Sequence, residues 1–337
     1  MALNEDKKLY HVSSSPHVRA SVTTQKIMTD VIIAMLPAAA FGVYRFGIHA
    51  LIVVLATVAA AVISEYLYEY FMKRPITITD GSAVVTGMIL ALNMPPEIPV
   101  WMPMLGAVFA IVVVKQLYGG LGQNFMNPAL AARCFLLISF SRAMTDFSAS
   151  FPAGSADAVS GATPLAVLKA GGEASLSDLF FGNIAGTIGE VSVLMLLIGA
   201  AYLLIRGVIS IRIPAVYIAT VAVFMGLFGG RGFDLYYVAC EICAGGLIFG
   251  AFFMATDYVT TPITPLGQIL FGVFIGILTG VFRVFGASAE GVSYAIIIGN
   301  IVAPLIERAT VPTPFGKGRY AEITKKLMHE NSERGGK

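Results

Sequence analysis

The chain contains 337 residues, of which 57% are hydrophobic and 12% are charged, and its formal net charge at pH 7 is +2. Soluble domains typically carry about 25% charged residues, so this composition excludes an ordinary soluble enzyme and indicates a membrane protein. No concentrated basic surface is predicted, which excludes a nucleic-acid partner.

Hydrophobic windows of about 19 residues predict the membrane-spanning segments in chain order. The ten predicted segments are 27–44, 48–71, 82–94, 100–117, 128–140, 187–205, 213–229, 236–254, 266–284 and 292–307. The third and the fifth are too short to cross a hydrocarbon layer of about 30 Å as simple helices, so we expect irregular backbone inside the protein to complete them. Binding sites of membrane transporters commonly form at such breaks.

The polar segment 1–26 lacks the hydrophobic core of a cleavable signal, so we expect the first span to remain in the mature protein. With this segment in the cytoplasm, 16 Lys and Arg residues, Lys115 among them, fall inside and five, Arg283 among them, fall outside. Cytoplasmic segments are enriched in Lys and Arg, so both 1–26 and the tail 309–337 are predicted to be cytoplasmic. The polar connection 141–186 is then predicted to be extracytoplasmic.

The two hydrophobic regions, 27–140 and 187–308, resemble each other. In each, an apolar run meets a proline-containing break, which is followed by a glycine-containing helix, a loop, and Asn, Pro and Arg in that order. Because five spans separate equivalent segments, the repeats must be inverted in the membrane. The sequence thus predicts an all-α integral membrane protein of about ten transmembrane helices, arranged as two inverted five-helix repeats with broken or short helices.

The polar connection contains Ser160, Gly161, Ala162 and Thr163, followed by Pro164. Composition alone favours a helix start here, with Thr163 as the N-cap. The four residues also resemble a flavinylation motif, in which a threonine hydroxyl is joined through a phosphoester to the phosphate of FMN. In that family a separate flavin transferase makes the bond from FAD outside the cytoplasm. No His or Lys adjoins Thr163 to activate it, so self-catalysed attachment is not expected.

A glycine-rich stretch, residues 119–133, leads into the fifth predicted span. The carboxamides of Asn124 and Asn127 point the same way if the helix begins at Asn124. Carboxamides donate and accept hydrogen bonds, which suits the pyrimidine edge or the ribityl chain of a flavin. The alternative is a tight helix entry with capping asparagines. Arg133, within the span, requires an anionic partner, which is either an acid or a polar group of a flavin.

These two motifs, together with residues 256–262 and 299–304, resemble the family that contains the D subunit of the Rnf complex and the homologous B subunit of the sodium-pumping NADH:quinone oxidoreductase. The resemblance covers nearly the whole membrane portion, and the chain length and short N-terminal extension are more similar to the Rnf branch. It implies a flavoprotein of a bacterial or archaeal cell membrane, in a complex with the A, B, C, E and G subunits. Such a complex passes electrons between reduced ferredoxin and NAD while moving Na⁺ or H⁺.

The resemblance also implies cofactors. It assigns a covalent FMN to Thr163 and, as in related subunits, a non-covalent riboflavin near the asparagine motif, with Asn124, Asn127 and Arg133 as candidate contacts. The sequence has no Gly-x-Gly-x-x-Gly after a predicted strand, so NAD and ferredoxin must be bound by partner subunits. The isolated chain should therefore be inactive as a full oxidoreductase.

Acidic residues inside a membrane are costly and usually functional. Four acids qualify by their position in the sequence: Glu65, Asp80, Glu241 and Asp257. Asp257 is the strongest candidate for a Na⁺ ligand because it adjoins the break of the second repeat. Freed carbonyls and the hydroxyls of Thr256, Thr260 and Thr261 would complete an oxygen shell there. The alternative is a surface charge that caps a helix.

A transporter or channel that carries no electrons is a competing interpretation, because inverted repeats, broken helices and a glycine-rich interior suit it equally well. In that case Thr163 is only a helix cap, and Asp257 binds a transported ion. A purely structural scaffold for a complex is a third interpretation, supported only by the lack of a soluble catalytic domain.

Overall fold

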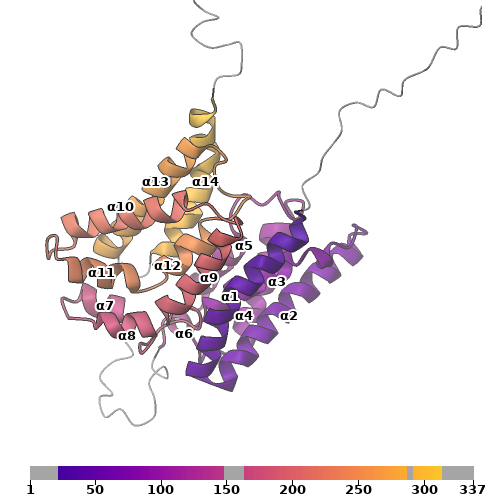
Figure 1. Ribbon diagram of the computed structural model, residues 1–337. Helices are drawn as coiled ribbons and strands as arrows, with labels where there is room; N and C mark the ends of the chain where they lie inside the picture. Colours follow the sequence, from indigo (N-terminus) through magenta and orange to yellow (C-terminus); the bar gives the residue numbers. More distant parts are fainter. Residues whose placement is uncertain (1–21, 148–162, 287–290, 313–337) are drawn as a thin grey trace, which may run out of the picture.

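A computed structural model of the protein describes residues 22–147, 163–286 and 291–312. Over these residues the chain forms helices and loops and contains no β-strand, as the hydrophobic pattern predicts. Figure 1 shows the helices of the first half, in indigo to magenta, packed beside those of the second half, in pink through orange to yellow.

The first half contains four long or medium helices and several short elements. In chain order they are α1 (Thr24–Phe46), α2 (Ile48–Phe71), η1 (Ile78–Asp80), α3 (Ser82–Leu92), α4 (Trp101–Val108), η2 (Phe109–Gln116), α5 (Pro128–Ser139) and α6 (Ser141–Met144). The element η2 continues α4 directly and has π-helical hydrogen bonding. A π-helical turn carries an extra residue, which changes the direction in which the following side chains point.

The second half begins with two short helices on the polar connection and continues into longer ones. In chain order they are α7 (Pro164–Lys169), α8 (Leu176–Phe181), α9 (Val193–Ile205), α10 (Arg212–Phe228), α11 (Leu235–Cys243), α12 (Leu247–Phe249), η4 (Gly250–Met254), α13 (Pro265–Phe285) and α14 (Val292–Thr310).

Every one of the ten predicted segments contains a helix, but fewer helices qualify as full spans. By length and composition, α1, α2, α13 and α14 can cross a membrane, and α11 with α12–η4 forms a fifth candidate bent by 66°. The other apolar helices have 10 to 17 residues, and α3 and α5 are as short as predicted. The chain is therefore an all-helical membrane protein with short and broken helices, while the count of ten transmembrane helices stays a prediction.

The bend between α11 and α12 was not expected, because the sequence predicts one span over 236–254. The chain turns at Gly245, whose φ of 66° lies in the left-handed region that favours glycine. Gly246 lies so close to the carboxylate of Glu190 that a Cβ there would clash with it. The two glycines thus let the backbone turn and approach a buried side chain.

Helices α1 and α9, which correspond to the first predicted span of each repeat, lie against each other and run in opposite directions. Tyr202 Oη donates to Asp30 Oδ1 at 2.8 Å, and further along the pair Gly199 lies against Ala34. The last long helices of the halves, α5 and α14, also contact each other. An antiparallel pairing of equivalent helices is what inverted repeats require, so this packing supports the predicted inversion.

Small residues allow the closest helix contact of the second half, between α10 and α13. Gly272, Gly276 and Gly280 lie on one face of α13 and contact side chains of α10. The buried Tyr217 hydroxyl and Thr279 Oγ1 share a hydrogen bond of 2.7 Å across the same interface. Small residues and interhelical hydrogen bonds are the usual means of holding helices together in a membrane, where apolar burial contributes little.

Candidate functional site

Thr163 begins the short helix α7 on the polar connection. Its backbone is extended (φ −63°, ψ 149°), and its Oγ1 accepts a hydrogen bond from Ala166 N at 3.4 Å. The predicted helix start, with Thr163 as the N-cap and Pro164 after it, is confirmed. Thr163 is half-buried, and its single cap hydrogen bond is long. The motif residues Ser160, Gly161 and Ala162 lie outside the described residues.

Helix α7 is fixed to the second half by both apolar and polar contacts. Leu165 and Leu168 are buried in the core. Lys169 Nζ donates to the carbonyl of Gly286, directly after α13. Arg231, which follows α10, donates to two carbonyls just past α7 and lies over an aromatic ring of α11. The position of Thr163 relative to the helical bundle is therefore set by four side chains.

A partly open pocket lies beneath α7, between α10, α11 and α13, and its empty space is about 590 Å³ when the part open to solvent is included. Glu241 and Arg283 line it and form a buried ion pair, with 3.1 Å between Arg283 NH1 and Glu241 Oε2. Arg283 NH2 also donates to Ala244 O at 3.1 Å, at the bend between α11 and α12. Arg283, which the charge count placed on the outer side, is thus buried and binds the carbonyl at the bend.

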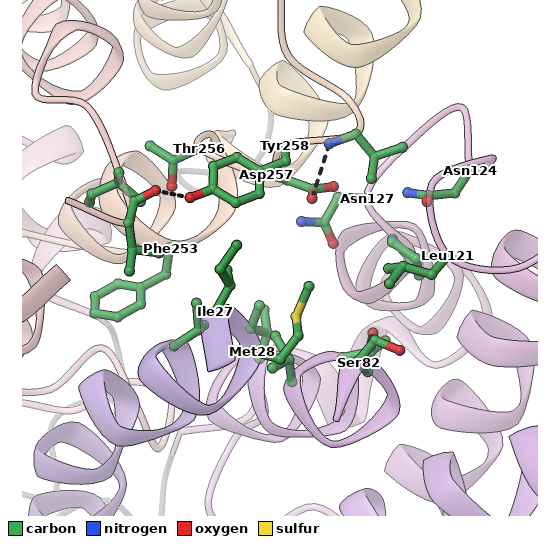
Figure 2. Close-up of a pocket in the computed structure, with 18 of the residues that line it drawn as sticks. Ile27, Met28, Ser82, Leu121, Asn124, Asn127, Phe253, Thr256, Asp257 and Tyr258 are labelled. Atoms are coloured by element: carbon green, nitrogen blue, oxygen red, sulfur yellow. Dashed lines mark hydrogen bonds between the residues drawn. The ribbon is translucent and has the colours of Figure 1, made fainter. Parts of the chain in front are cut away.

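A second pocket, the α1 pocket, lies at the other end of the molecule, where α1 begins (Figures 1 and 2). It lies between the two halves of the chain and is partly open, and its empty space is about 800 Å³ when the part open to solvent is included. Its walls are mainly apolar and include Ile27, Val31, Ile89, Leu203 and Phe253. The polar residues that line it include Ser82, Lys115, Asn124, Asn127 and Asp257.

Asn124 and Asn127 both line the α1 pocket, but they do not lie on one helix face, as the sequence suggested if a helix began at Asn124. Helix α5 begins at Pro128, so the two carboxamides do not share a helix face. Asn127 Oδ1 caps α5 by accepting from Ala129 N at 3.0 Å, and its Nδ2 lies 3.5 Å from Met254 O. The glycine-rich loop brings the two asparagines together, with positive φ at three of its glycines.

Asp257 lies on the opposite wall of the α1 pocket from α1 and α3 (Figure 2). Its Oδ2 accepts from Thr260 Oγ1 at 3.1 Å and its Oδ1 from Val259 N at 3.5 Å. Burial raises the pKa of the Asp257 carboxyl above its ordinary value, although these two hydrogen bonds oppose the shift. Of the three threonines expected to join it, Thr260 alone donates to its carboxylate, because Thr256 and Thr261 bond backbone carbonyls.

Asp257 is not part of a cluster of metal-binding side chains. No group of three or more His, Cys, Asp and Glu side chains suitable for a metal ion occurs in the described parts of the chain. A Na⁺ ion at Asp257 would therefore depend on carbonyl, hydroxyl and water oxygens, which this cation accepts. The assignment of a Na⁺ site to Asp257 stays a prediction.

Arg133 lies between the two ends, not in the α1 pocket. It is 4% exposed, and its NH1 lies 2.6 Å from Asn93 Oδ1, 3.3 Å from Glu190 Oε1 and 3.1 Å from Ser293 Oγ. The anionic partner that the sequence analysis required is thus Glu190. Because Asn93 ends α3 and Ser293 begins α14, Arg133 joins the two halves of the chain. This position speaks against its expected role as a riboflavin contact in the α1 pocket.

Lys115 was not predicted as a site residue and was only counted among the charges on the cytoplasmic side. Lys115 is 2% exposed, and its Nζ lies 2.6 Å from both Glu65 Oε1 and Ser82 Oγ. The sequence does contain one indication that a buried cation is present. Glu65 lies inside a predicted span, and its carboxylate therefore needs a cation nearby. Lys115 lies in the last turn of η2, whose π-helical hydrogen bonding cannot be predicted from the sequence.

The α1 pocket fits a flavin in chemical character. Cofactor pockets commonly have apolar walls with a few placed polar groups, which suits a flat ring system with hydrogen-bonding edges. Asn124 is 6% exposed, and its carboxamide is bonded only within its own loop, through Nδ2 to Met126 O at 3.0 Å. Its oxygen thus remains an available acceptor at the pocket, and Ser82 and Lys115 supply further polar groups there.

Comparison with known proteins identifies relatives along almost the whole chain. The profile of the NQR2, RnfD, RnfE family matches residues 11–316. The chain is 48% identical over 310 residues to the D subunit of the Na⁺-translocating ferredoxin:NAD⁺ oxidoreductase complex of Acetobacterium woodii, covering 90% of this chain and 95% of that protein. It is 44% identical over 325 residues to the D subunit of the proton-translocating ferredoxin:NAD⁺ oxidoreductase complex of Clostridium ljungdahlii, covering 93% and 98%.

A more distant relative comes from an archaeon. The chain is 33% identical over 308 residues to the D subunit of the ion-translocating oxidoreductase complex of Methanosarcina acetivorans, and the match covers 91% of this chain and 97% of that protein. All three similarities extend over both halves of the helical bundle and over both candidate sites.

Replacing Arg133 with Ala should strongly destabilise the protein. The change removes the guanidinium that lies 3.3 Å from the buried Glu190 carboxylate, and breaking a buried ion pair costs about 3–5 kcal/mol. The melting midpoint of the chain in detergent, followed by reaction of the buried thiols with a maleimide dye, should fall clearly. Arg133→Lys, which keeps the charge, should lose less. A midpoint unchanged in Arg133→Ala would contradict the central role of this contact.

Proposed function

Because the chain belongs to the NQR2, RnfD, RnfE family, we propose that it carries electrons across the membrane part of an ion-translocating ferredoxin:NAD oxidoreductase complex. The relatives from Acetobacterium woodii and Clostridium ljungdahlii are D subunits of such complexes. The observation that carries the proposal is the presence of two flavin-compatible sites at opposite ends of one bundle. One is Thr163 at the start of α7, and the other is the α1 pocket.

At the α7 end, we propose that FMN is joined to Thr163 Oγ1 through a phosphoester. The attachment needs an exposed hydroxyl and small neighbours, and the sequence supplies Gly161 and Ala162. No His or Lys bonds to the Thr163 hydroxyl in the described structure, which accords with modification by a separate flavin transferase. The anchoring of α7 by Leu165 and Lys169 would hold the group at a fixed place on the bundle.

At the α1 end, we propose that a non-covalent flavin, riboflavin by family resemblance, occupies the α1 pocket. Asn124 and Asn127 would hold its polar edge, while the apolar walls from α1, α3 and α9 would bury the ring. A bound flavin supplies one-electron and two-electron chemistry, and the protein supplies position and polarity. The chain holds the two sites at a constant separation, and the A, B, C, E and G subunits would supply the ferredoxin and NAD sites.

Ion coupling is proposed at Asp257, which lines the same pocket as the two asparagines. Moving one elementary charge against 100 mV needs about 2.3 kcal/mol, so a downhill electron step of similar size must be linked to it. A carboxylate at the proposed electron-carrier site can link the two, because a cation or proton there compensates an added electron. Na⁺ and H⁺ both meet this requirement.

Replacing Thr163 with Ala should abolish covalent flavin. The full chain, co-expressed with a flavin transferase, should give a fluorescent band under ultraviolet light after denaturing electrophoresis. The Thr163→Ala band should be dark because the phosphoester has no acceptor oxygen.

Thr145→Ala, another threonine near the polar connection, is the matched control and should stay fluorescent. The wild-type band should also be dark without the transferase. If wild-type chain from its native membrane shows no fluorescence, the covalent assignment is wrong, and the transporter interpretation becomes the better one.

Replacing Asn124 with Ala should weaken flavin binding in the α1 pocket. Loss of one hydrogen bond of about 1–1.5 kcal/mol lowers affinity roughly tenfold. The measurement is the amount of flavin that acid releases per chain, after purification of chain made without a transferase. Asn127→Asp, which keeps the α5 cap but lacks the amide donor, should behave similarly. The exposed Asn183→Ala is the control, and equal flavin in all four proteins would refute the assignment.

Replacing Asp257 with Asn should uncouple ion movement from electron transfer. In vesicles that contain the whole complex, ferredoxin-driven NADH formation and ion uptake are measured together, separately for Na⁺ and H⁺. The number of ions moved per electron should fall in Asp257→Asn, whereas the exposed Glu97→Gln should behave as wild type. An unchanged ratio would exclude Asp257 as the coupling residue.

A further inference from the structure

We propose that Asp80, Ser82 and Lys115 form a proton pathway from the membrane surface to the α1 pocket. The pathway supplies the proton that accompanies reduction of an electron carrier bound in that pocket. The proposal deepens the proposed function, since it rests on a flavin in the α1 pocket. It assigns to this chain a set of proton-transfer residues at the start of α3.

The pathway consists of two short hydrogen bonds in series. Lys115 Nζ donates to Ser82 Oγ at 2.6 Å, and Ser82 Oγ donates to Asp80 Oδ1 at 2.6 Å. Both distances are within the range over which a proton passes between groups in direct contact. Three groups that can each give and take a proton are therefore connected without a gap.

The two ends of this series lie in different surroundings. Lys115 is 2% exposed and lines the α1 pocket, and Ser82 lines it too (Figure 2). Asp80 is half-buried in η1, directly after the exposed segment 71–77, and does not line the pocket. The series thus leads from a group that water reaches to a group that faces the cavity.

Acidic side chains lie on several sides of Lys115. Glu65 Oε1 lies 2.6 Å from its Nζ, and Glu65 Oε2 is buried with no hydrogen-bond partner. Glu69, from the same helix, contacts Gln116, and Asp257 lines the facing wall of the pocket. Arg74 binds the carbonyl of Gln116 and is the other cation close by.

Each proton transfer along the pathway is balanced. On addition of an electron to a carrier in the α1 pocket, Lys115 would give that carrier a proton, and an N–H bond at Nζ would break. The neutral amine would take the hydroxyl proton of Ser82. The oxygen of Ser82 would take a proton that the Asp80 carboxylate has received from hydronium at the surface, which restores the carboxylate that accepts from Ser82 Oγ. One proton enters per electron, and all three residues return to their starting state.

A purely structural role for this cluster predicts something different. The Lys115–Glu65 ion pair would hold η2 against α2 without any help from Asp80 or the Ser82 hydroxyl. Substitutions at Asp80 and Ser82 leave the Lys115–Glu65 ion pair intact. They therefore distinguish a role in proton transfer from a purely structural role. In Asp80→Asn the side-chain oxygen can still accept from Ser82 N, a bond of 2.8 Å in the wild type, so the start of α3 is preserved.

The test uses the full chain in lipid nanodiscs, made without a flavin transferase, so that the α1 pocket holds the only flavin. Light-driven reduction by a soluble one-electron donor is followed by flavin absorbance, and proton uptake is followed by a pH-indicator dye. Acid-released flavin is counted in each sample. Ser82→Ala and Asp80→Asn should slow proton uptake at least about tenfold while the flavin content stays the same.

Two variants are the matched controls. Ser82→Thr keeps a hydroxyl and should restore rapid proton uptake. Ser64→Ala removes another buried hydroxyl, one that bonds only the carbonyl of Ala60 in its own helix, and should leave the rate unchanged. If Ser82→Ala loses its flavin, the test of proton transfer rests on Asp80→Asn. Asp80 does not line the pocket, so this variant should keep its flavin.

The possible failures are distinct. The pathway is refuted if proton uptake is equally fast in wild type, Ser82→Ala and Asp80→Asn while all three bind flavin. That result would leave the proposed function unaffected. Wild-type chain that retains no flavin refutes the α1 pocket as a flavin site, and the pathway falls with it.

Discussion

Three buried cations, each paired with an acid, are the constraint on which the described bundle depends. Lys115 pairs with Glu65 at 2.6 Å, and Arg283 pairs with Glu241 at 3.1 Å. Arg133 meets Glu190 at 3.3 Å between them. Charges in a low-dielectric interior are tolerated only when they are paired and hydrogen-bonded, so each pair dictates how its segments must meet.

Each of these cations also holds an end of a short or bent helix. Lys115 binds the first residue of α3, and Arg133 binds Asn93, where α3 ends. Arg283 binds the carbonyl of Ala244, where the α11–α12 bend begins. Short helices leave helix ends inside the protein, and these buried charged side chains bind residues at those ends. The same short helices line the α1 pocket and the interior beneath α7, so the electrostatic framework also positions the candidate sites.

The sequence predicted the features that depend on local pattern, and it missed those that depend on long-range pairing. The helix start at Thr163 follows from residue type alone, and so do the short third and fifth helices. That Arg133 needs an acid was predictable, but its partner Glu190 lies in a loop 57 residues away. Lys115 was taken for a surface charge because hydropathy does not show in which direction a side chain points. The bend at Gly245 is hidden within a continuous apolar run.

The antiparallel contact of α1 with α9 has a consequence for biosynthesis. Asp30, near the start of α1, bonds Tyr202 and Arg206, which are made 172 and 176 residues later. The first helix therefore enters the bilayer with a carboxylate whose partners do not yet exist, and it must wait near the lipid headgroups or be held by the insertion machinery. The first half therefore cannot reach its final packing before α9 has been synthesised.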